Sequence, residues 1–366
     1  MSVVNLIAFN RKIPVKFIKF TRELQLLTNF KNIRCISTST YTSQIRNDDI
    51  PVHIFDRNTK HLQRERAASA TDVNLYDYLK DEIGYRLADR VFDIKRKFKL
   101  AADIGCSRGY VSKHITPDSV EELILCDSSK ANLDSIKVKD GLKIRKQILD
   151  EENIHFEPNS LDLVVSSLNL HWVNDLPGAF KRILNSLKQD GVFLASVFGG
   201  DTLYELRSSL QLAEIERRGG LSPHISPFTE VRDIGSLLSR AGFTMLTIDT
   251  DEIVITYPSM FELMWDLKGM AESNAATNRV IHLHRGTQFA AAAIYQELYG
   301  KYDPETGKST VPATFQIINM LGWKPHPKQP KPVERGTGEV SLKDLYKLNE
   351  IIREVKKVKT DDDQKN

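Results

Sequence analysis

The stretch LAADIGCSRGY, residues 100–110, decides the fold of this chain. Its first residues are apolar and suit a buried β-strand, which Asp103 and Gly105 bring to an end. A short loop follows, and Gly109 is expected to open a helix over 109–115 whose backbone N–H groups face a ligand. Because ligands of open parallel sheets bind at the carboxyl ends of the strands, the stretch predicts a cofactor-binding loop.

Two positions of this loop separate the possible cofactors. The NAD fingerprint G-x-G-x-x-G needs glycine at the positions of Ser107 and Tyr110, so a standard NAD site is excluded. The frame that remains, D-x-G-x-x-x-G, is that of S-adenosylmethionine (SAM) enzymes. SAM has no pyrophosphate, so it requires a close backbone approach less strictly, and a serine at the middle position can still donate a hydrogen bond. The loop predicts SAM, bound by Asp103, Gly105, Ser107 and Gly109.

Short apolar runs alternate with helical segments after this loop. Alternation at this spacing indicates right-handed βαβ units and a parallel sheet covered on both faces. A later helix is expected over 229–241, ended by Gly242, and two β-rich runs within 243–257 are expected to finish the sheet as an antiparallel pair. Strands are predicted at 100–104, 122–126, 144–148, 161–167 and 191–198, and helices at 109–115, 130–137 and 176–187.

Helical spacing also marks segments outside this alternation. Helices are expected near 259–272 and 286–299. Residues 72–93 predict a helix that leads into the sheet. The residues expected on its apolar face are Leu75, Leu79, Ile83, Leu87 and Val91.

Acidic residues follow the second and third predicted strands. Asp127 stands 24 residues after Asp103 and is placed to accept hydrogen bonds from ribose hydroxyls. Asp150 and Glu151 are placed to meet the adenine amino group. Each acid taken singly also fits a solvated loop end, but three consecutive strand ends that carry acids favour a cofactor site.

The basic residues of the chain concentrate at its N-terminus. Residues 1–46 contain eight Lys or Arg and one acid, Glu23, whereas the rest of the chain has 43 basic and 47 acidic residues. This acidic remainder argues against nucleic acid as a partner, because phosphate neutralisation needs clustered positive charge. The first 46 residues are also rich in Ser and Thr and mix apolar with basic side chains, which is typical of a mitochondrial transit peptide. A disordered basic arm is the alternative.

Metal chemistry and membrane insertion find little support in the sequence. The three cysteines form no C-x-x-C pair, so neither a zinc site nor a disulfide framework is indicated. His155 and Glu157 have the H-x-E spacing of an iron site, and His282 lies close to His284, but both pairs are interpreted as surface or loop residues. No metal site is predicted. No run of about 18 apolar residues occurs, so at most peripheral contact with a membrane is expected.

Longer stretches of the chain resemble one known family. LAADIGCSRGY, LDLVVSSLNLHWVNDLP, FGGDTLYELRSSLQLAE and SPHISPF look like the mitochondrial complex I assembly factor 5 family. The similarity runs from about Phe55 to Trp323. The loop of that family is usually GCGRG, so Ser107 departs from it. A more distant likeness, at Ser167 to Trp172, is to the malonyl-carrier-protein methyltransferases of biotin synthesis.

The resemblance implies a fold, a function and a location. The fold is the α/β class I SAM-dependent methyltransferase fold, Rossmann-like, with a mostly parallel seven-stranded sheet and a helical cap or insertion. The family is described as hydroxylating an arginine of the iron–sulfur subunit of complex I near the quinone site, early in assembly. The implied partners are that subunit and other assembly factors, in the mitochondrial matrix and peripheral to the inner membrane. Nothing in composition or spacing derives hydroxylation.

Candidate working residues follow the fourth predicted strand. Asn169, His171 and Trp172 stand where a reactive methyl group or a substrate would lie. His171 could act as a general base near neutral pH, and Trp172 could form a cation–π wall against a guanidinium group. The alternative is that both pack against the next helix. Asp201 and Glu205 could bind the guanidinium in bidentate fashion, or could be a helix-capping Asp and an exposed Glu.

Two other functions stay open. One is a SAM-dependent methyltransferase acting on a small carboxylate, a quinone precursor or a carrier-bound acyl group. The other is a non-catalytic assembly chaperone that keeps SAM as a structural ligand. An arginine substrate predicts an acidic, aromatic-walled mouth, whereas an acyl substrate predicts an apolar mouth with a basic anchor.

The expected organisation has five parts. They are a transit peptide (1–46), a helical lead-in (47–98), a SAM-binding domain (99–257) with an insertion at about 200–227, a C-terminal helical cap (258–324) and a flexible tail (325–366).

Overall fold

The computed structural model describes residues 53–136, 141–303 and 307–330 of the chain. The expected transit peptide and most of the expected tail lie outside the described residues. Within these described ranges no helix is long and apolar enough to cross a membrane.

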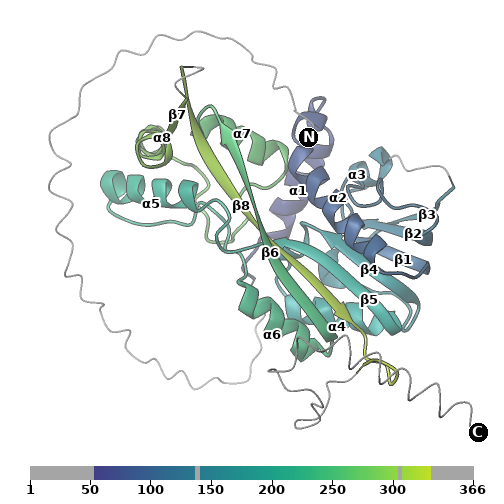
Figure 1. The fold of residues 1–366 in the computed structure, drawn as a ribbon. Helices are drawn as coiled ribbons and strands as arrows, with labels where there is room; N and C mark the ends of the chain where they lie inside the picture. The colour runs from purple at the N-terminus through teal and green to yellow at the C-terminus, as the bar shows by residue number, and fades with distance from the viewer. Residues whose placement is uncertain (1–52, 137–140, 304–306, 331–366) are drawn as a thin grey trace, which may run out of the picture. The chain divides into compact units, whose positions relative to one another are not determined.

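The strands form one sheet in the order β3-β2-β1-β4-β5-β8-β6, and the short β7 pairs with β8 (Figure 1). The first five strands of this order pair in parallel, as the alternation of apolar runs and helices predicted. β8 is antiparallel to both of its neighbours, β5 and β6. The bounds are β1 Phe98–Ile104, β2 Val120–Asp127, β3 Lys143–Ile148, β4 Leu161–Ser167, β5 Leu187–Phe198, β6 Thr244–Tyr257, β7 Lys301–Asp303 and β8 Lys308–Trp323.

Helices cover both faces of the sheet because successive strand residues point to opposite sides. Ile104 of β1 belongs to an apolar cluster with α4 (Leu176–Ser186) and α6 (Val231–Ala241). Ala101, on the other face of β1, packs in a cluster with α2 (Tyr78–Asp93). The shorter elements are α3 (Lys130–Ser135), η3 (Glu151–Asn153) and η4 (Leu170–Trp172).

The N-terminal lead-in contains two helices and a short 3₁₀ turn. Asp56 caps the N-terminus of α1 (Arg57–Ala68), and its side chain accepts a hydrogen bond from Thr59 N. The predicted helix over 72–93 divides into η2 (Val73–Leu75) and α2. The apolar face of α2 is buried as predicted, but Leu75 lies before that helix and is 70% exposed.

A second group of helices lies beyond the parallel strands, where β6 and β8 extend past the rest of the sheet (Figure 1). Leu206, Leu263, Tyr295 and Phe315 belong to its shared apolar core. The helices of this group are α5 (Tyr204–Arg218), α7 (Met260–Gly269) and α8 (Arg285–Tyr299).

Three predicted elements differ from the structure. The helix expected over 109–115 is wrong: residues 107–114 form turns, because Ser107 (φ 51°) and Gly109 (φ 79°) have left-handed backbone that a right-handed helix excludes. The two β-rich runs form one strand, β6, whose antiparallel partner is β8. The segment 258–324, expected to be a helical cap, is therefore only partly helical, since β8 lies inside the sheet.

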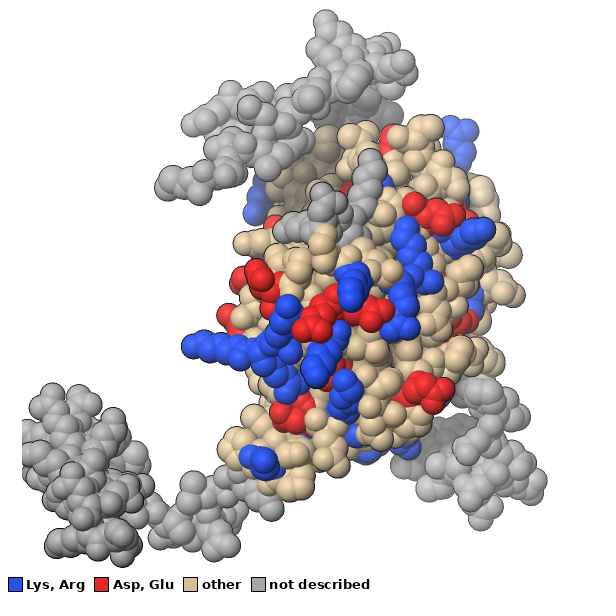
Figure 2. Space-filling view, turned by 90° about the vertical axis from the view of Figure 1, so that its right-hand side faces the viewer, with Lys and Arg blue, Asp and Glu red and all other residues tan. Residues whose placement is uncertain are grey.

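Charged side chains of both signs share the surface near β3. Figure 2 shows this side of the molecule, with Lys and Arg interspersed with Asp and Glu. Arg145 of β3, for example, pairs with Glu122 of β2. This face therefore has no uninterrupted basic stripe among its described residues.

Candidate functional site

The loop after β1 requires glycine at Gly105. A Cβ atom there would lie 1.4 Å from Nδ2 of Asn169, and the left-handed backbone (φ 68°) also favours glycine. Ser107, at the position of the missing middle glycine, is likewise left-handed, and its N–H donates to Oδ2 of Asp127 at 2.9 Å. A backbone hydrogen bond to Asp127 therefore stabilises the loop, and a serine at position 107 can make it.

Two buried aspartates lie at the ends of β1 and β2. Asp127 accepts hydrogen bonds from the N–H groups of Ser107 and Ser129, the latter at 2.7 Å. Asp103 is fully buried, and neither of its carboxylate oxygens has a hydrogen-bond partner among the described residues. Burial, together with the nearby charge of Asp127, raises the pKa of Asp103 to about 8. Asp103 is therefore largely protonated at neutral pH and can donate a hydrogen bond.

The acids after β3 are held by arginines of α1. Arg64 Nη1 donates to Oε1 of Glu151 at 2.6 Å, and Arg57 binds the other oxygen of Glu151 and Oδ1 of Asp150 at 2.7 Å. Burial alone would raise the pKa of Glu151, but the charges of Arg64 and Arg57 lower it to about 2. Glu151 is thus fully ionised and already paired. Neither acid stands free toward an adenine group in this conformation.

Arg64 also reaches the end of β4. Its Nη2 donates to Oδ1 of Asn169 at 2.8 Å, and Nδ2 of Asn169 donates to Glu151 at 3.0 Å. Gly105, Ser107, Asp127 and Asn169, all predicted site residues, line one cavity together with Arg64. The structure therefore brings this part of the predicted site together. Asp150 lies apart from it, on a cavity of about 280 Å³ that Arg64 also lines.

His171 and Trp172 surround the carboxylate of Glu272, which follows α7. Trp172 Nε1 donates to Oε2 of Glu272 at 2.9 Å, and His171 Nε2 lies 3.4 Å from the same oxygen. Lys80 of α2 pairs with Oε1 at 2.7 Å, and Lys60 of α1 lies 3.5 Å from Oε2. These five buried residues are called the Glu272 cluster below.

The titration of the cluster follows from these contacts. Burial would raise the pKa of Glu272, but the charges of Lys60 and Lys80 hold it well below its usual value. Burial lowers the pKa of His171 to about 4, and its ring lies between those of Trp172, Phe198 and Phe228. His171 is therefore neutral at pH 7 and packed among rings. This environment makes it a weak general base. The rings around it belong to η4, β5 and the loop at Phe228, and none of them to α4, the helix named in the packing alternative.

One face of α1 carries three basic side chains into the site. Arg57, Lys60 and Arg64 stand at i, i+3 and i+7, a spacing that places them on the same side of a helix. Arg57 and Arg64 bind the acids near β3, and Lys60 enters the Glu272 cluster. This set is called the α1 basic face. It contacts the ends of several strands at once.

The polar groups of the strand ends fit SAM, but the space between them does not in this conformation. SAM offers ribose hydroxyls and an amino group, for which Asp127 and the unpartnered oxygens of Asp103 are suitable partners. The cavity at the loop, however, measures only about 30 Å³, little more than a water molecule occupies. Arg64 and Asn169 are among its lining residues, so SAM could enter only if lining side chains such as these move.

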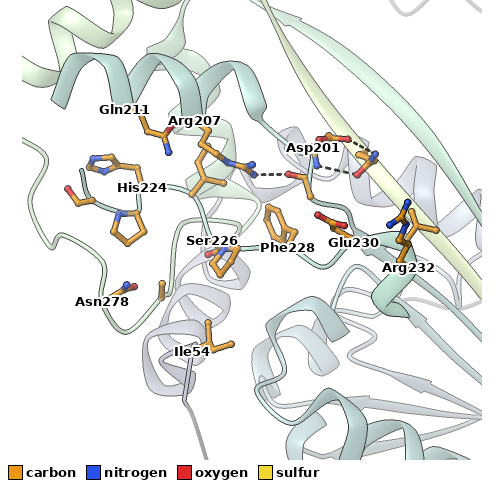
Figure 3. Close-up of a pocket in the computed structure, with 18 residues that line it drawn as sticks. Ile54, Asp201, Arg207, Gln211, His224, Ser226, Phe228, Glu230, Arg232 and Asn278 are labelled. Carbon is orange, nitrogen blue, oxygen red and sulfur yellow. Dashed lines mark hydrogen bonds between the residues drawn. The ribbon is translucent and has the colours of Figure 1, made fainter. Parts of the chain in front are cut away.

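A larger pocket lies on the side of the 220–232 loop, between α5 and the segment around residue 278 (Figure 3). Its volume is about 840 Å³, and Asp201, Arg207, Glu230 and Arg232 line it. A second cavity of about 360 Å³ shares His224, Ile225, Ser226 and Phe228 with it and has Glu272 in its lining. The two cavities are therefore adjacent, and the smaller one borders Glu272.

The two acids predicted to bind a guanidinium group have different positions. Asp201 lines the large pocket and accepts a hydrogen bond from Gln316 Nε2 at 3.0 Å. Glu205 is buried, and both of its carboxylate oxygens accept hydrogen bonds from Thr314 of β8. Glu205 therefore attaches α5 to the sheet, and it is neither a free ligand nor the exposed residue of the alternative.

Two of the three histidines weighed for a metal, His155 and His284, have hydrogen-bond contacts within the chain. His284 accepts a hydrogen bond from Gly286 N at the start of α8, and His155 contacts Asn153 O. Across the described ranges, no group of three His, Cys, Asp or Glu side chains gathers as a metal site would require.

Several residues of this site were not predicted from the sequence. The spacing of Arg57, Lys60 and Arg64 is a signal that could have found them, because basic residues at i, i+3 and i+7 form one stripe on a helix. Lys80 lies within the predicted helix 72–93, between the apolar positions Leu79 and Ile83. Glu272 carries no local signal, since its role depends on contacts with residues about 100 to 210 positions away.

Comparison with known proteins gives both a domain and close relatives. Residues 102–195 match the methyltransferase domain family. A protein of Danio rerio named arginine-hydroxylase NDUFAF5, mitochondrial, is 51% identical over 300 residues, which span 82% of this chain and 92% of that protein. A malonyl-[acyl-carrier protein] O-methyltransferase of a Methylovorus species is 28% identical and spans 75% of this chain and 90% of its own length.

Solved structures show a weaker likeness. The YcgJ protein of Bacillus subtilis has a TM-score of 0.45 and 14% sequence identity, covering 66% of this chain and 98% of YcgJ. The methyltransferase domain match and the strand order show that the chain has the class I SAM methyltransferase fold that the sequence predicted.

Proposed function

Because the chain belongs to the NDUFAF5 family of mitochondrial arginine hydroxylases, we propose that it hydroxylates an arginine of the iron–sulfur subunit of complex I. The substrate arginine is the one near the quinone site, modified early in assembly. The proposed location is the matrix side of the inner membrane, in peripheral contact with it, and the proposed partners are that subunit and other assembly factors.

The observation that carries the proposal is the lining of the cavity of about 360 Å³. Among mostly apolar residues, this lining includes Glu272 and the ring of Phe228. An acidic group beside aromatic rings suits a cationic side chain. Arg279 also lines the cavity, but its guanidinium is paired with Asp56 at 3.1 Å and bonded to Thr59, so it is not a free anchor for an acyl carboxylate.

The proposed reaction replaces a C–H bond of the substrate arginine by C–OH. With dioxygen as the oxidant, one oxygen atom enters the product. The other leaves as water after taking up two electrons and two protons from an external reductant. The substrate gains one oxygen atom and no other mass.

SAM is the proposed cofactor, held by Asp103, Asp127 and the loop from Gly105 to Gly109. When bound, SAM supplies an electrophilic methyl group, which the methyltransferase alternative would use. We expect Asp127→Asn to weaken SAM binding about 10- to 100-fold, because a hydrogen bond to a charged group contributes about 1.5–3 kcal/mol. Isothermal titration calorimetry measures the affinity, and Asp134→Asn, at an exposed position of α3, is the matched control. Unchanged affinity in Asp127→Asn contradicts the assignment.

The function is tested by mass spectrometry of complex I subunits from cells that lack the protein. An arginine of the iron–sulfur subunit is expected to lose the mass of one oxygen atom. Re-expression of the wild-type chain should restore that mass. If no arginine changes, the hydroxylase proposal is refuted.

A second candidate is a methyltransferase that acts on a carrier-bound acyl group. The similarity to the malonyl-[acyl-carrier protein] O-methyltransferase and the apolar wall of Leu203, Leu206 and Leu210 support it. The same spectra distinguish the two, since this activity leaves the oxygen content of complex I unchanged. It would instead transfer a methyl group from SAM to a carboxylate of the acyl substrate, and a loss of methylated acyl product from the cells would support it.

A further inference from the structure

We propose that the ring face of Trp172 and the carboxylate of Glu272 form the binding site for the substrate's guanidinium group, and that Lys60 of α1 occupies this site in the conformation described here. The identity of the ligand as an arginine side chain rests on the proposed function. The site itself rests on the geometry of the Glu272 cluster.

A cation already sits on the proposed site. Nζ of Lys60 lies 3.5 Å from the centre of the Trp172 ring and 3.5 Å from Oε2 of Glu272. Its side chain is 2% exposed, and it also donates to the carbonyl of Ala271. An aromatic face with a carboxylate beside it binds ammonium and guanidinium groups by the same electrostatic attraction. Burial lowers the pKa of Lys60, and the charge of Glu272 opposes that shift. The contacts of its amino group show the geometry in which the site holds a basic nitrogen.

The site would keep its shape without Lys60. Glu272 is fixed by Trp172 Nε1 at 2.9 Å and by Lys80 of α2 at 2.7 Å, and neither group belongs to α1. Phe55 packs edge-on against Trp172 with ring centroids 5.3 Å apart. Withdrawal of Lys60 takes away one of the two basic partners of Glu272, and a guanidinium group would take its place. A buried carboxylate gains from such a partner, because an unpaired buried charge is costly.

Two cavities have Glu272 in their lining. They are the small cavity at the loop and the cavity of about 360 Å³. The latter adjoins the large pocket of Figure 3, with which it shares His224, Ile225, Ser226 and Phe228. Leu206 and Leu267 line its wall and suit the aliphatic stem of an arginine. A side chain entering there would end at Glu272, next to the cofactor loop.

The α1 basic face couples this site to the cofactor site. Lys60 occupies the Glu272 cluster, and Arg64 separates the loop cavity from the cavity beside Asp150. Since both belong to one helix, a movement of α1 that admits SAM also withdraws Lys60. Binding of either ligand should favour binding of the other, because both bind the same conformation.

The test measures binding of ethylguanidinium, the head group of arginine, to the full chain by isothermal titration calorimetry. Lys60→Met should bind it at least about tenfold more tightly than the wild type, since the competing cation is gone while side-chain volume is kept. Arg66→Met, at an exposed position of the same helix, is the matched control and should bind like the wild type. Ethylurea, a neutral analogue of similar shape, should not bind.

The role of each partner is tested in the Lys60→Met background. Glu272→Gln should abolish the gained affinity, and Trp172→Phe, which keeps an aromatic face, should reduce it only in part. Circular dichroism checks that each variant is folded, and Trp172→Phe provides the result if the Glu272 variant does not fold. The proposal is overturned if Lys60→Met gains no affinity, or if the gain persists in Glu272→Gln or is unaffected in Trp172→Phe.

Failure of this proposal can be told from failure of the proposed function. If Glu272→Gln restores the oxygen on the subunit arginine in cells, the hydroxylase function stands and this site is refuted. If ethylguanidinium binds as expected but no subunit arginine carries the oxygen, the site stands and the function is refuted.

Discussion

The carboxyl groups of Asp103, in β1, and Glu151, after β3, are both fully buried, yet their surroundings leave the first neutral and the second ionised at pH 7. The carboxyl oxygens of Asp103 have no hydrogen-bond partner within the described part of the chain, and burial raises the pKa of Asp103 to about 8. Glu151 lies between Arg57 and Arg64, whose charges outweigh burial and lower its pKa to about 2. The comparison teaches that the state of an acid at this sheet edge depends on whether α1 reaches it.

The largest loss of stability is expected from removing the charge of Glu151, the acid that is paired with two arginines. Glu151→Gln leaves two guanidinium groups partly or wholly buried without their counter-charge. We expect the free energy of unfolding to fall by about 3–5 kcal/mol, as for other buried ion pairs that lose one partner. Urea denaturation measures it, and Glu157→Gln at an exposed position is the control. A loss no larger than that of the control would show that the α1 basic face does not stabilise this edge.

A double variant sharpens this result. Arg64→Met combined with Glu151→Gln removes one unpaired guanidinium, so the double variant should lose less stability than the sum of the two single variants. Additive losses would mean that the two side chains do not interact.

Asp103, the unpaired acid, should make the free energy of unfolding depend on pH in the opposite sense to Glu151, whose pKa is lowered. The pKa of Asp103 rises from 3.8 in the unfolded chain to about 8 in the folded protein. Its stabilising contribution is therefore complete below 3.8 and is lost as the pH rises through 8. Relative to wild type, Asp103→Asn should gain about 2–4 kcal/mol between about pH 5 and pH 8.

Urea denaturation across this pH range checks the prediction for Asp103. Asp118→Asn, at an exposed position, serves as the control. A difference between wild type and Asp103→Asn that does not change with pH would show that Asp103 is ionised throughout.

The smallest change in the free energy of unfolding is expected at a partly exposed ion pair. Arg90 of α2 lies 2.7 Å from Asp249 of β6, and their side chains are 30% and 44% exposed. Water screens this pair, so Arg90→Ala should change the free energy of unfolding by no more than about 1 kcal/mol. Urea denaturation again measures the change. A loss as large as that of Glu151→Gln would mean that burial does not explain the comparison.

Local patterns predicted the parallel half of the sheet well. Apolar runs and turn residues predicted β1, β2, β4 and β5 because these strands are largely buried segments between recognisable breaks. β3 was predicted as well, although its side chains are mostly exposed. The helix expected over 109–115 was wrong because the backbone at Ser107 and Gly109 is left-handed, which the loop geometry imposes. The last strands were incompletely predicted, since β8 enters the sheet between β5 and β6 from a distant part of the chain.

The sequence by itself determined the loop of residues 100–110, the exclusion of a standard NAD fingerprint and the acids at successive strand ends. These features depend on residues that are neighbours in the chain or recur at a fixed spacing. The tertiary structure alone decided which acids are free, because Arg57 and Arg64 come from a helix about 90 residues before Glu151. The same holds for Lys60, which reaches Trp172 and Glu272 from 112 and 212 positions away. The physical reason is that a buried charge takes its state from its nearest partners in space, whatever their distance along the chain.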